Sequence, residues 1–78
     1  MVIGFVLIST ATGKEKDVFK TLRKVSDILE VYPLFGEYDI IAKIEAKDFN
    51  HLGTVVVKKI RSIPGVIDTK TLAGIDIL

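Results

Sequence analysis

The tetrad Gly36-Glu37-Tyr38-Asp39 is a short polar link between two apolar runs near the middle of the 78-residue chain. It divides the sequence into two halves of similar pattern. Glycine can take a positive φ at a turn without steric cost, and an aspartate beside it can bond local backbone or a ligand. The tetrad therefore predicts a hairpin, a binding site, or both.

The first half has the pattern of a strand, a helix and a second strand. Residues 2–9 and 28–35 are apolar runs of strand composition, and Pro33 predicts a bulge or an edge position because proline cannot donate to a ladder. Between these runs, residues 14–26 carry apolar side chains at helical spacing with lysine and arginine among them. The apolar positions of this helix are Val18, Phe19, Leu22 and Val25.

The second half repeats the pattern. Residues 38–45 alternate as in a strand with one core face, on which we expect Tyr38, Ile40, Ala42 and Ile44. Asp48 is a suitable N-cap for a helix that ends at Pro64-Gly65, and residues 66–75 form the last strand. The apolar stripe predicted for this helix contains Phe49, Leu52, Val56, Ile60 and Ile63.

The predicted order is β-α-β-β-α-β, and no linker or low-complexity segment interrupts it, so residues 1–78 are expected to form one domain. Two βαβ halves with right-handed crossovers, joined by a hairpin at the tetrad, give a ferredoxin-like fold. The fold class is therefore α+β, with an antiparallel sheet and both helices on one face.

The other face of this sheet is then uncovered. In residues 2–9, Ile3, Phe5 and Leu7 alternate with the core positions, so the uncovered face is apolar as well. Hydrophobic residues make up 49% of the chain, and a domain of this size hides only about 60% of its unfolded surface. We therefore expect a homodimer, formed by packing of this face against the same face of a second copy.

Composition excludes several classes of function. Eleven Lys and Arg against ten Asp and Glu give a net charge of +1, which lacks the basic field of a nucleic-acid binder. There are no cysteines, so disulfides, thiolate metal sites and cysteine nucleophiles are excluded, and a reducing cytoplasm is the expected compartment. One histidine and scattered carboxylates predict neither a metal nor a cofactor. The apolar run near the N-terminus is too short to span a membrane.

Two places could carry chemistry, and the residues leave alternatives open at each. His51, in the first turn of the second helix, is either a general base of a small cofactor-free enzyme or a solvated residue without a partner. Asp39 could hold an ammonium while backbone N–H groups around Gly36 hold a carboxylate, which suits a free amino acid. The alternative for Asp39 is a hairpin whose aspartate bonds its own backbone.

The tetrad, the later Ile63-Pro64-Gly65-Val66 and the segment Thr69-Lys70-Thr71 together resemble the effector-binding (RAM) domain of the Lrp/AsnC family of transcription regulators. The resemblance covers nearly all 78 residues. It implies a dimer of the α+β barrel type made by sheet-to-sheet packing, further association into rings, and an amino-acid effector bound between dimers near the Gly-x-Tyr-Asp turn.

Carried over by position, the resemblance places Gly36, Tyr38 and Asp39 at the effector site, with Glu37 as a variable neighbour. The hydroxyls of Thr69 and Thr71 would complete the hydrogen bonds to the effector. Family members carry an N-terminal helix-turn-helix, whereas this chain begins at its first strand.

We therefore expect a non-enzymatic module that senses amino acids and oligomerises. It would not bind DNA directly and would co-assemble with full-length regulators or serve another partner. An ACT-type domain acting on a metabolic enzyme is the alternative, and its ligand would lie near residues 10–13.

Overall fold

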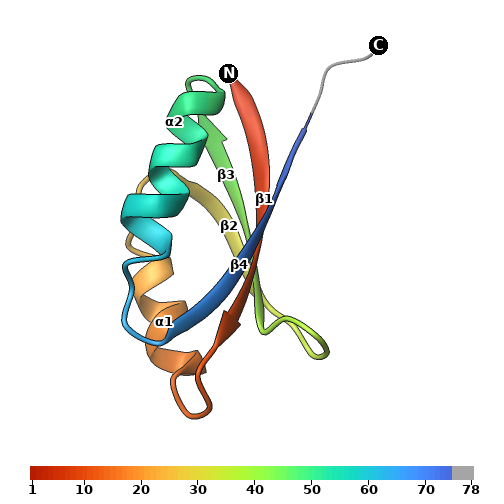
Figure 1. The fold of residues 1–78 in the computed structure, drawn as a ribbon, viewed down its shortest axis with the longest axis vertical. Coiled ribbons are helices and arrows are strands. Elements are labelled where there is room, and N and C mark those ends of the chain that lie inside the picture. Colours follow the sequence, from red (N-terminus) through yellow and green to blue (C-terminus); the bar gives the residue numbers. More distant parts are fainter. Residues whose placement is uncertain (75–78) are drawn as a thin grey trace.

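The chain alternates strands and helices in the order β-α-β-β-α-β that the sequence predicts. The computed structural model describes residues 1–74 (Figure 1). Helix α2 continues directly into a π-helical segment, η1, so the two form one continuous helical rod. The elements are β1 (Val2–Thr10), α1 (Glu15–Leu22), β2 (Ile28–Pro33), β3 (Ile40–Ala46), α2 (Phe49–Thr54), η1 (Val55–Ile60) and β4 (Val66–Ala73).

The four strands form one antiparallel sheet in the order β2-β3-β1-β4. Both helical segments cover the same face of this sheet, and the other face has no second layer (Figure 1). The predicted ferredoxin-like α+β fold is thereby confirmed. β2 lies at an edge of the sheet and ends at Pro33, which confirms the edge position expected for the proline.

The core lies between the sheet and the helices. In β3 the side chains of Ile40, Ala42 and Ile44 are at most 1% exposed and those between them are half-buried, which confirms the predicted alternation. The predicted start of the strand is wrong, because Tyr38 precedes β3 and is only half-buried. The central strand β1 contributes Val6 and Ile8 to the same layer. The helices cover them with Val18, Leu22, Leu52, Val55, Val56 and Ile60, and Ile63 follows the last turn.

Both helices depart in detail from the sequence expectation. α1 ends at Leu22 rather than near residue 26, because the N–H groups of Lys24 and Val25 bond to carbonyls only three residues back and so tighten the chain into a turn. In the second helix, the Asp48 side chain accepts the His51 N–H at 2.8 Å, which confirms the predicted N-cap.

The apolar stripe of the second helix is also shifted. Phe49 is 56% exposed, so its predicted place in the stripe is wrong, and Val55 is buried instead. Phe49 is the first residue of α2, directly after the cap, where the helix has just begun to cover the sheet. In η1 the Arg61 N–H bonds to the Val56 carbonyl five residues back, which widens the turn and brings Val55, Val56 and Ile60 to the core. Ile75, expected at the end of β4, lies outside the described residues.

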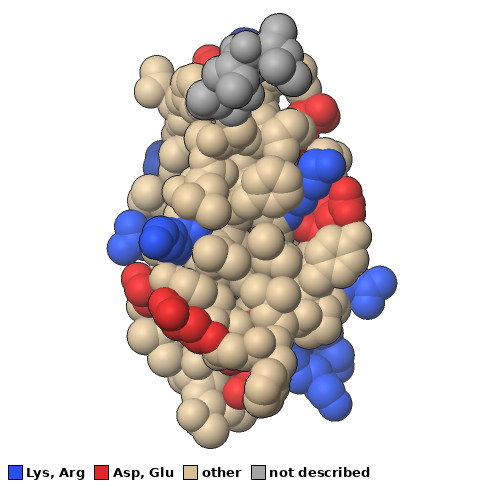
Figure 2. Space-filling view, turned by 90° about the vertical axis from the view of Figure 1, so that its right-hand side faces the viewer, with Lys and Arg blue, Asp and Glu red and all other residues tan. Residues whose placement is uncertain are grey.

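The uncovered face of the sheet is apolar along its middle. Strand register places Phe5 beside Lys43 on one side and beside Leu72 on the other, and Leu7 lies beside Ile41. Phe5 is 37% exposed and Leu72 is 50% exposed. Figure 2, which views the molecule from this side, shows uncharged atoms down the middle and most charged groups toward the two sides. In the described part of the chain, no helix has the length and apolar character needed to cross a membrane.

Candidate functional site

The tetrad forms the loop between β2 and β3, as a hairpin at this position requires. The loop is closed by a hydrogen bond from the Leu34 N–H to the Asp39 carbonyl at 2.7 Å. Gly36 has a φ of +139°, a backbone conformation that residues other than glycine rarely adopt. In Figure 1 this hairpin projects from the sheet on the side away from the helices. The predicted hairpin is confirmed.

The side chain of Asp39 bonds to strand β1 rather than to its own loop. Its Oδ2 atom accepts the backbone N–H of Thr10 at 2.8 Å and the Thr10 hydroxyl at 3.2 Å. Its own N–H donates to the Ile8 carbonyl at 2.9 Å. The alternative of an aspartate that bonds only its own hairpin backbone is therefore wrong. Among residues 1–74 the second carboxylate oxygen, Oδ1, makes no hydrogen bond, so it can accept one from a ligand.

A depression of about 280 Å³ opens beside Asp39, between α1 and the base of the hairpin. Its walls are mostly apolar. The residues that line it are Glu15, Lys16, Phe19, Pro33, Asp39 and Ile40. None of the three residues from α1 was a predicted site residue, because only the fold brings that helix beside the hairpin.

Thr69 and Thr71 lie on β4, on the other side of β1 from Asp39. Thr69 is opposite Ile8 and Thr71 is opposite Val6. Because Ile8 and Val6 face the helices, the two threonine side chains lie on that same face of the sheet, at its β4 edge. Two strand spacings of about 4.8 Å separate β4 from β3. Within the described residues no hydrogen bond joins the threonines to the tetrad, and a shared role in one site remains a prediction.

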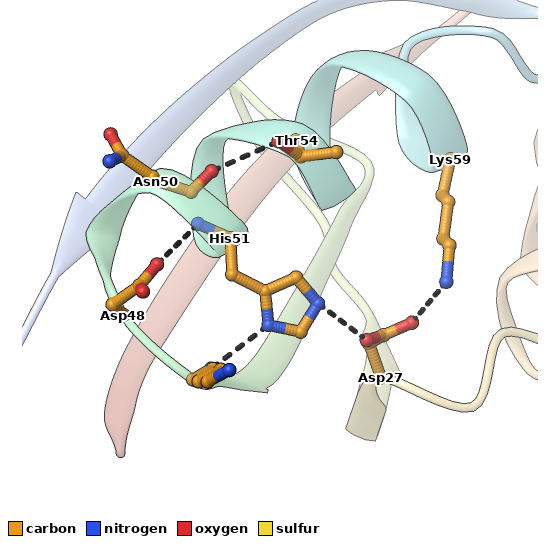
Figure 3. Close-up of polar contacts among 7 residues, drawn as sticks. Asp27, Asp48, Asn50, His51, Thr54 and Lys59 are labelled. Atoms are coloured by element: carbon orange, nitrogen blue, oxygen red, sulfur yellow. Dashed lines mark hydrogen bonds and ion pairs between the residues drawn. The ribbon is translucent and has the colours of Figure 1, made fainter.

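His51 has partners that the sequence did not reveal (Figure 3). Its Nδ1 accepts the backbone N–H of Lys47 at 2.9 Å, and its Nε2 lies 3.4 Å from Oδ2 of Asp27, in the turn before β2. The Lys59 ammonium lies 2.7 Å from the other carboxylate oxygen of Asp27. The expectation of a histidine without a second group is therefore wrong.

This cluster joins the turn before β2 to the helical rod. The hydrogen bond from Lys59 is the main cause that lowers the pKa of Asp27, and the positive charge of Lys59 acts in the same direction. Both ring nitrogens of His51 face a partner, so neither is free to take a proton from a substrate. Nor do three potential ligands of the His, Cys, Asp or Glu type converge anywhere in residues 1–74.

A cluster of three polar side chains, Glu30, Tyr32 and Lys43, lies on the uncovered sheet face beside its apolar middle. Lys43 and Glu30 form an ion pair at 3.4 Å, and the Tyr32 hydroxyl donates to the same carboxylate. The hydrogen bond from Tyr32, followed by that from Lys43, lowers the pKa of Glu30, and the bond to Glu30 raises the pKa of Tyr32. Phe5 and Ile41 complete a depression of about 180 Å³ at this point.

An antiparallel sheet in the order β2-β3-β1-β4 with both helices on one face (Figure 1) defines a ferredoxin-like domain. Residues 3–76 match the family model described as the Lrp/AsnC ligand binding domain. The chain belongs to this family, which confirms the resemblance found in the sequence.

Curated relatives include transcription regulators. The HTH-type transcriptional regulator FL11 of Pyrococcus abyssi is 39% identical over 70 residues, which cover 90% of this chain and 46% of that protein. The chain thus spans about half the length of such relatives. A homocitrate synthase of Sulfurisphaera tokodaii is 39% identical over 54 residues, which are 69% of this chain but only 12% of that enzyme.

Solved structures share the fold over nearly the whole chain. The crystal structure of FFRP-DM1 superimposes with a TM-score of 0.91 at 37% identity and covers 96% of this chain and 100% of that one. The transcriptional regulator NMB0573 of Neisseria meningitidis, solved as an L-Met complex, has a TM-score of 0.86 at 22% identity, with 99% of this chain and 51% of that chain covered. The second comparison bears on the fold only.

Proposed function

We propose that the chain is a non-enzymatic module that binds a free amino acid and assembles into dimers and higher rings of dimers. In this proposal the effector site contains Gly36, Glu37, Tyr38 and Asp39 of one copy, and Thr69 and Thr71 complete it from a neighbouring copy. The module acts on transcription through regulators of its own family rather than by direct DNA contact, since a net charge of +1 lacks the strong positive field of a DNA binder.

This proposal rests on the hydrogen bonding of the Asp39 carboxylate, which within residues 1–74 uses only one of its two oxygens. Thr10 holds one oxygen in place, and the other remains free to accept a hydrogen bond from an ammonium group. A carboxylate whose orientation is already fixed loses little conformational freedom when a ligand binds. Charge-assisted hydrogen bonds are also about twice as strong as neutral ones. The match to a family described as a ligand binding domain supports a small-molecule ligand, and a free carboxylate oxygen suits the ammonium group of an amino acid.

Dimer formation is supported by the uncovered sheet face. Its middle strands present Ile3, Phe5, Leu7 and Ile41, and these side chains are only partly buried in one copy. Covering about 400 Å² of such apolar surface contributes about 10 kcal/mol before the cost of association. Pairing of this face with itself follows twofold symmetry, the commonest arrangement of soluble oligomers.

Isothermal titration calorimetry with the twenty amino acids tests the effector site. We expect at least one to bind with a Kd in the millimolar range or tighter. Asp39→Asn keeps an acceptor for Thr10 but removes the charge, so it should weaken binding about tenfold or more. Asp68→Asn, an exposed change of the same chemistry on β4, is the matched control and should bind as the wild type does. If no amino acid binds, the sensing proposal is wrong.

A second candidate function is regulation of a metabolic enzyme, which the similarity to a segment of homocitrate synthase favours. The module would then bind its amino acid while attached to, or associated with, the enzyme. Native mass spectrometry of the chain mixed with a purified FL11-type regulator, and separately with a purified homocitrate synthase, distinguishes the two. Mixed assemblies with the regulator support the first function, and mixed assemblies with the enzyme support the second.

A further inference from the structure

The depression beside Asp39 lies within a single copy of the chain. Glu15, Lys16 and Phe19 belong to the first turns of α1, where spacings of three and four residues bring side chains to one face of a helix. Pro33 ends β2 and Ile40 begins β3, so these two residues and Asp39 form the base of the hairpin. The depression therefore connects the proposed effector turn to a helix that the family resemblance did not implicate.

Its floor is apolar. Ile40 is 1% exposed and belongs to the core, Phe19 is half-buried against that core, and Pro33 adds a third apolar wall. A volume of about 280 Å³ is just below the range for ligand pockets, which begins near 300 Å³. A depression of this size and character suits the side chain of a small apolar molecule.

The rim carries charges of both signs. Asp39 has its Oδ1 atom free, whereas its Oδ2 is held by Thr10. The Glu15 carboxylate accepts the Gly13 N–H at 3.0 Å through Oε1. Within residues 1–74, the Lys16 ammonium forms neither an ion pair nor a hydrogen bond. One free carboxylate oxygen and one free ammonium at the edge of an apolar depression complement the two charges of an amino acid.

We propose that this depression selects amino acids with an apolar side chain, which it seats against Phe19, Pro33 and Ile40. The α-ammonium group of the ligand bonds to Oδ1 of Asp39, and the α-carboxylate pairs with Lys16. This inference rests on the proposed amino-acid function and adds to it a ligand class and a binding residue, Lys16, that lies outside the tetrad.

A homologous series of ligands tests the selection directly. Calorimetry would compare alanine, 2-aminobutyrate, norvaline and norleucine, with aspartate and lysine as polar counterparts. Because one buried methylene contributes about 0.8 kcal/mol, each added carbon should strengthen binding about fourfold until the depression is filled. Aspartate and lysine should bind more weakly than norvaline.

Lys16→Glu tests the carboxylate contact. Reversing this charge should weaken norvaline binding at least about tenfold, since it replaces a charge-assisted hydrogen bond by repulsion. Lys20→Glu makes the same change on the same helix, outside the depression, and is the matched control. Both side chains are exposed, and equal melting temperatures by circular dichroism would establish that both variants fold.

The possible results separate this inference from the function on which it rests. Rising affinity along the series together with a specific loss in Lys16→Glu supports it. Equal affinities for alanine and norleucine, or equal binding by the two lysine variants, would overturn it while leaving amino-acid binding intact. Absence of binding by every amino acid would overturn the proposed function as well.

Discussion

The Oδ2 atom of Asp39 accepts both the backbone N–H and the hydroxyl of Thr10, at 2.8 Å and 3.2 Å. Thr10 ends the central strand β1, and Asp39 directly precedes β3. The pair thus ties the projecting hairpin to the middle of the sheet and fixes the direction of the free carboxylate oxygen. Both the stability of the hairpin base and the binding of an effector should depend on it.

Thr10→Val should lower the free energy of unfolding by about 1 kcal/mol, because it removes the hydroxyl donor while preserving the branched shape. Urea denaturation would measure the change. Thr12→Val, in the exposed loop that follows β1, is the control and should shift stability by no more than about 0.5 kcal/mol. Equal effects of the two changes would show that the hydroxyl bond contributes nothing.

Asp27 should make the free energy of unfolding depend on pH in the acid range. Its pKa in the folded state is lowered, mainly by the hydrogen bond from Lys59, so its contribution is fully present above the unfolded pKa near 3.8. That contribution is lost as the pH falls through the folded pKa. Lys59 is 49% exposed, which limits the pair to about 1 kcal/mol at most.

Urea denaturation of wild type and Asp27→Asn between pH 3 and pH 7 would measure this dependence. The two proteins should differ most near neutral pH and converge at the acid end. Asp17→Asn is an exposed change in α1, outside the cluster. Its free energy of unfolding should change with pH as that of the wild type does. A difference between wild type and Asp27→Asn that grows as the pH falls would contradict the assignment.

Gly4 in β1 lies against Leu52 of α2. A Cβ atom at this position would lie 2.6 Å from Cδ1 of Leu52. Gly4→Val should therefore destabilise the fold by about 1–3 kcal/mol through overpacking. Gly53→Ala in α2 meets nothing within 4 Å and should instead stabilise it by about 0.5–1 kcal/mol. Thermal unfolding would check both, and a stabilising Gly4→Val would contradict the packing described.

Ile41→Glu should reduce the assembly to monomers, because it places a charge in the middle of the uncovered sheet face beside Leu7 and Tyr32. Burying an unpaired carboxylate costs several kcal/mol, which is comparable to the gain from association. Val57→Glu on the helical side, where Val57 is 57% exposed, is the control. Analytical ultracentrifugation would compare them, and an intact oligomer in Ile41→Glu would exclude this face as the interface.

Much of the fold could be predicted because its signals are local. The alternation in β3, the Asp48 cap of α2 and the glycine turn at Gly36 each depend on residues close together in the sequence. The exposure of Phe49, in contrast, depends on where the second helix meets the sheet. Sequence periodicity carries no information on that placement.

The site was predictable only in part, for the same reason. Turn chemistry identified Gly36 and Asp39, but the partner of Asp39 is 29 residues away in the chain. Lys16 and Phe19 join the site only because α1 lies beside the hairpin. Asp27 reaches His51 in the same way, through the fold rather than through spacing. A charged residue near a turn gives no signal of such distant partners.

Light scattering with and without an amino-acid panel tests the central claim, effector-responsive assembly, most directly. We expect a mass of at least twice the 8.6 kDa of one chain, and a change in that mass on addition of at least one amino acid with an apolar side chain. A constant mass of 8.6 kDa under every condition would contradict that claim.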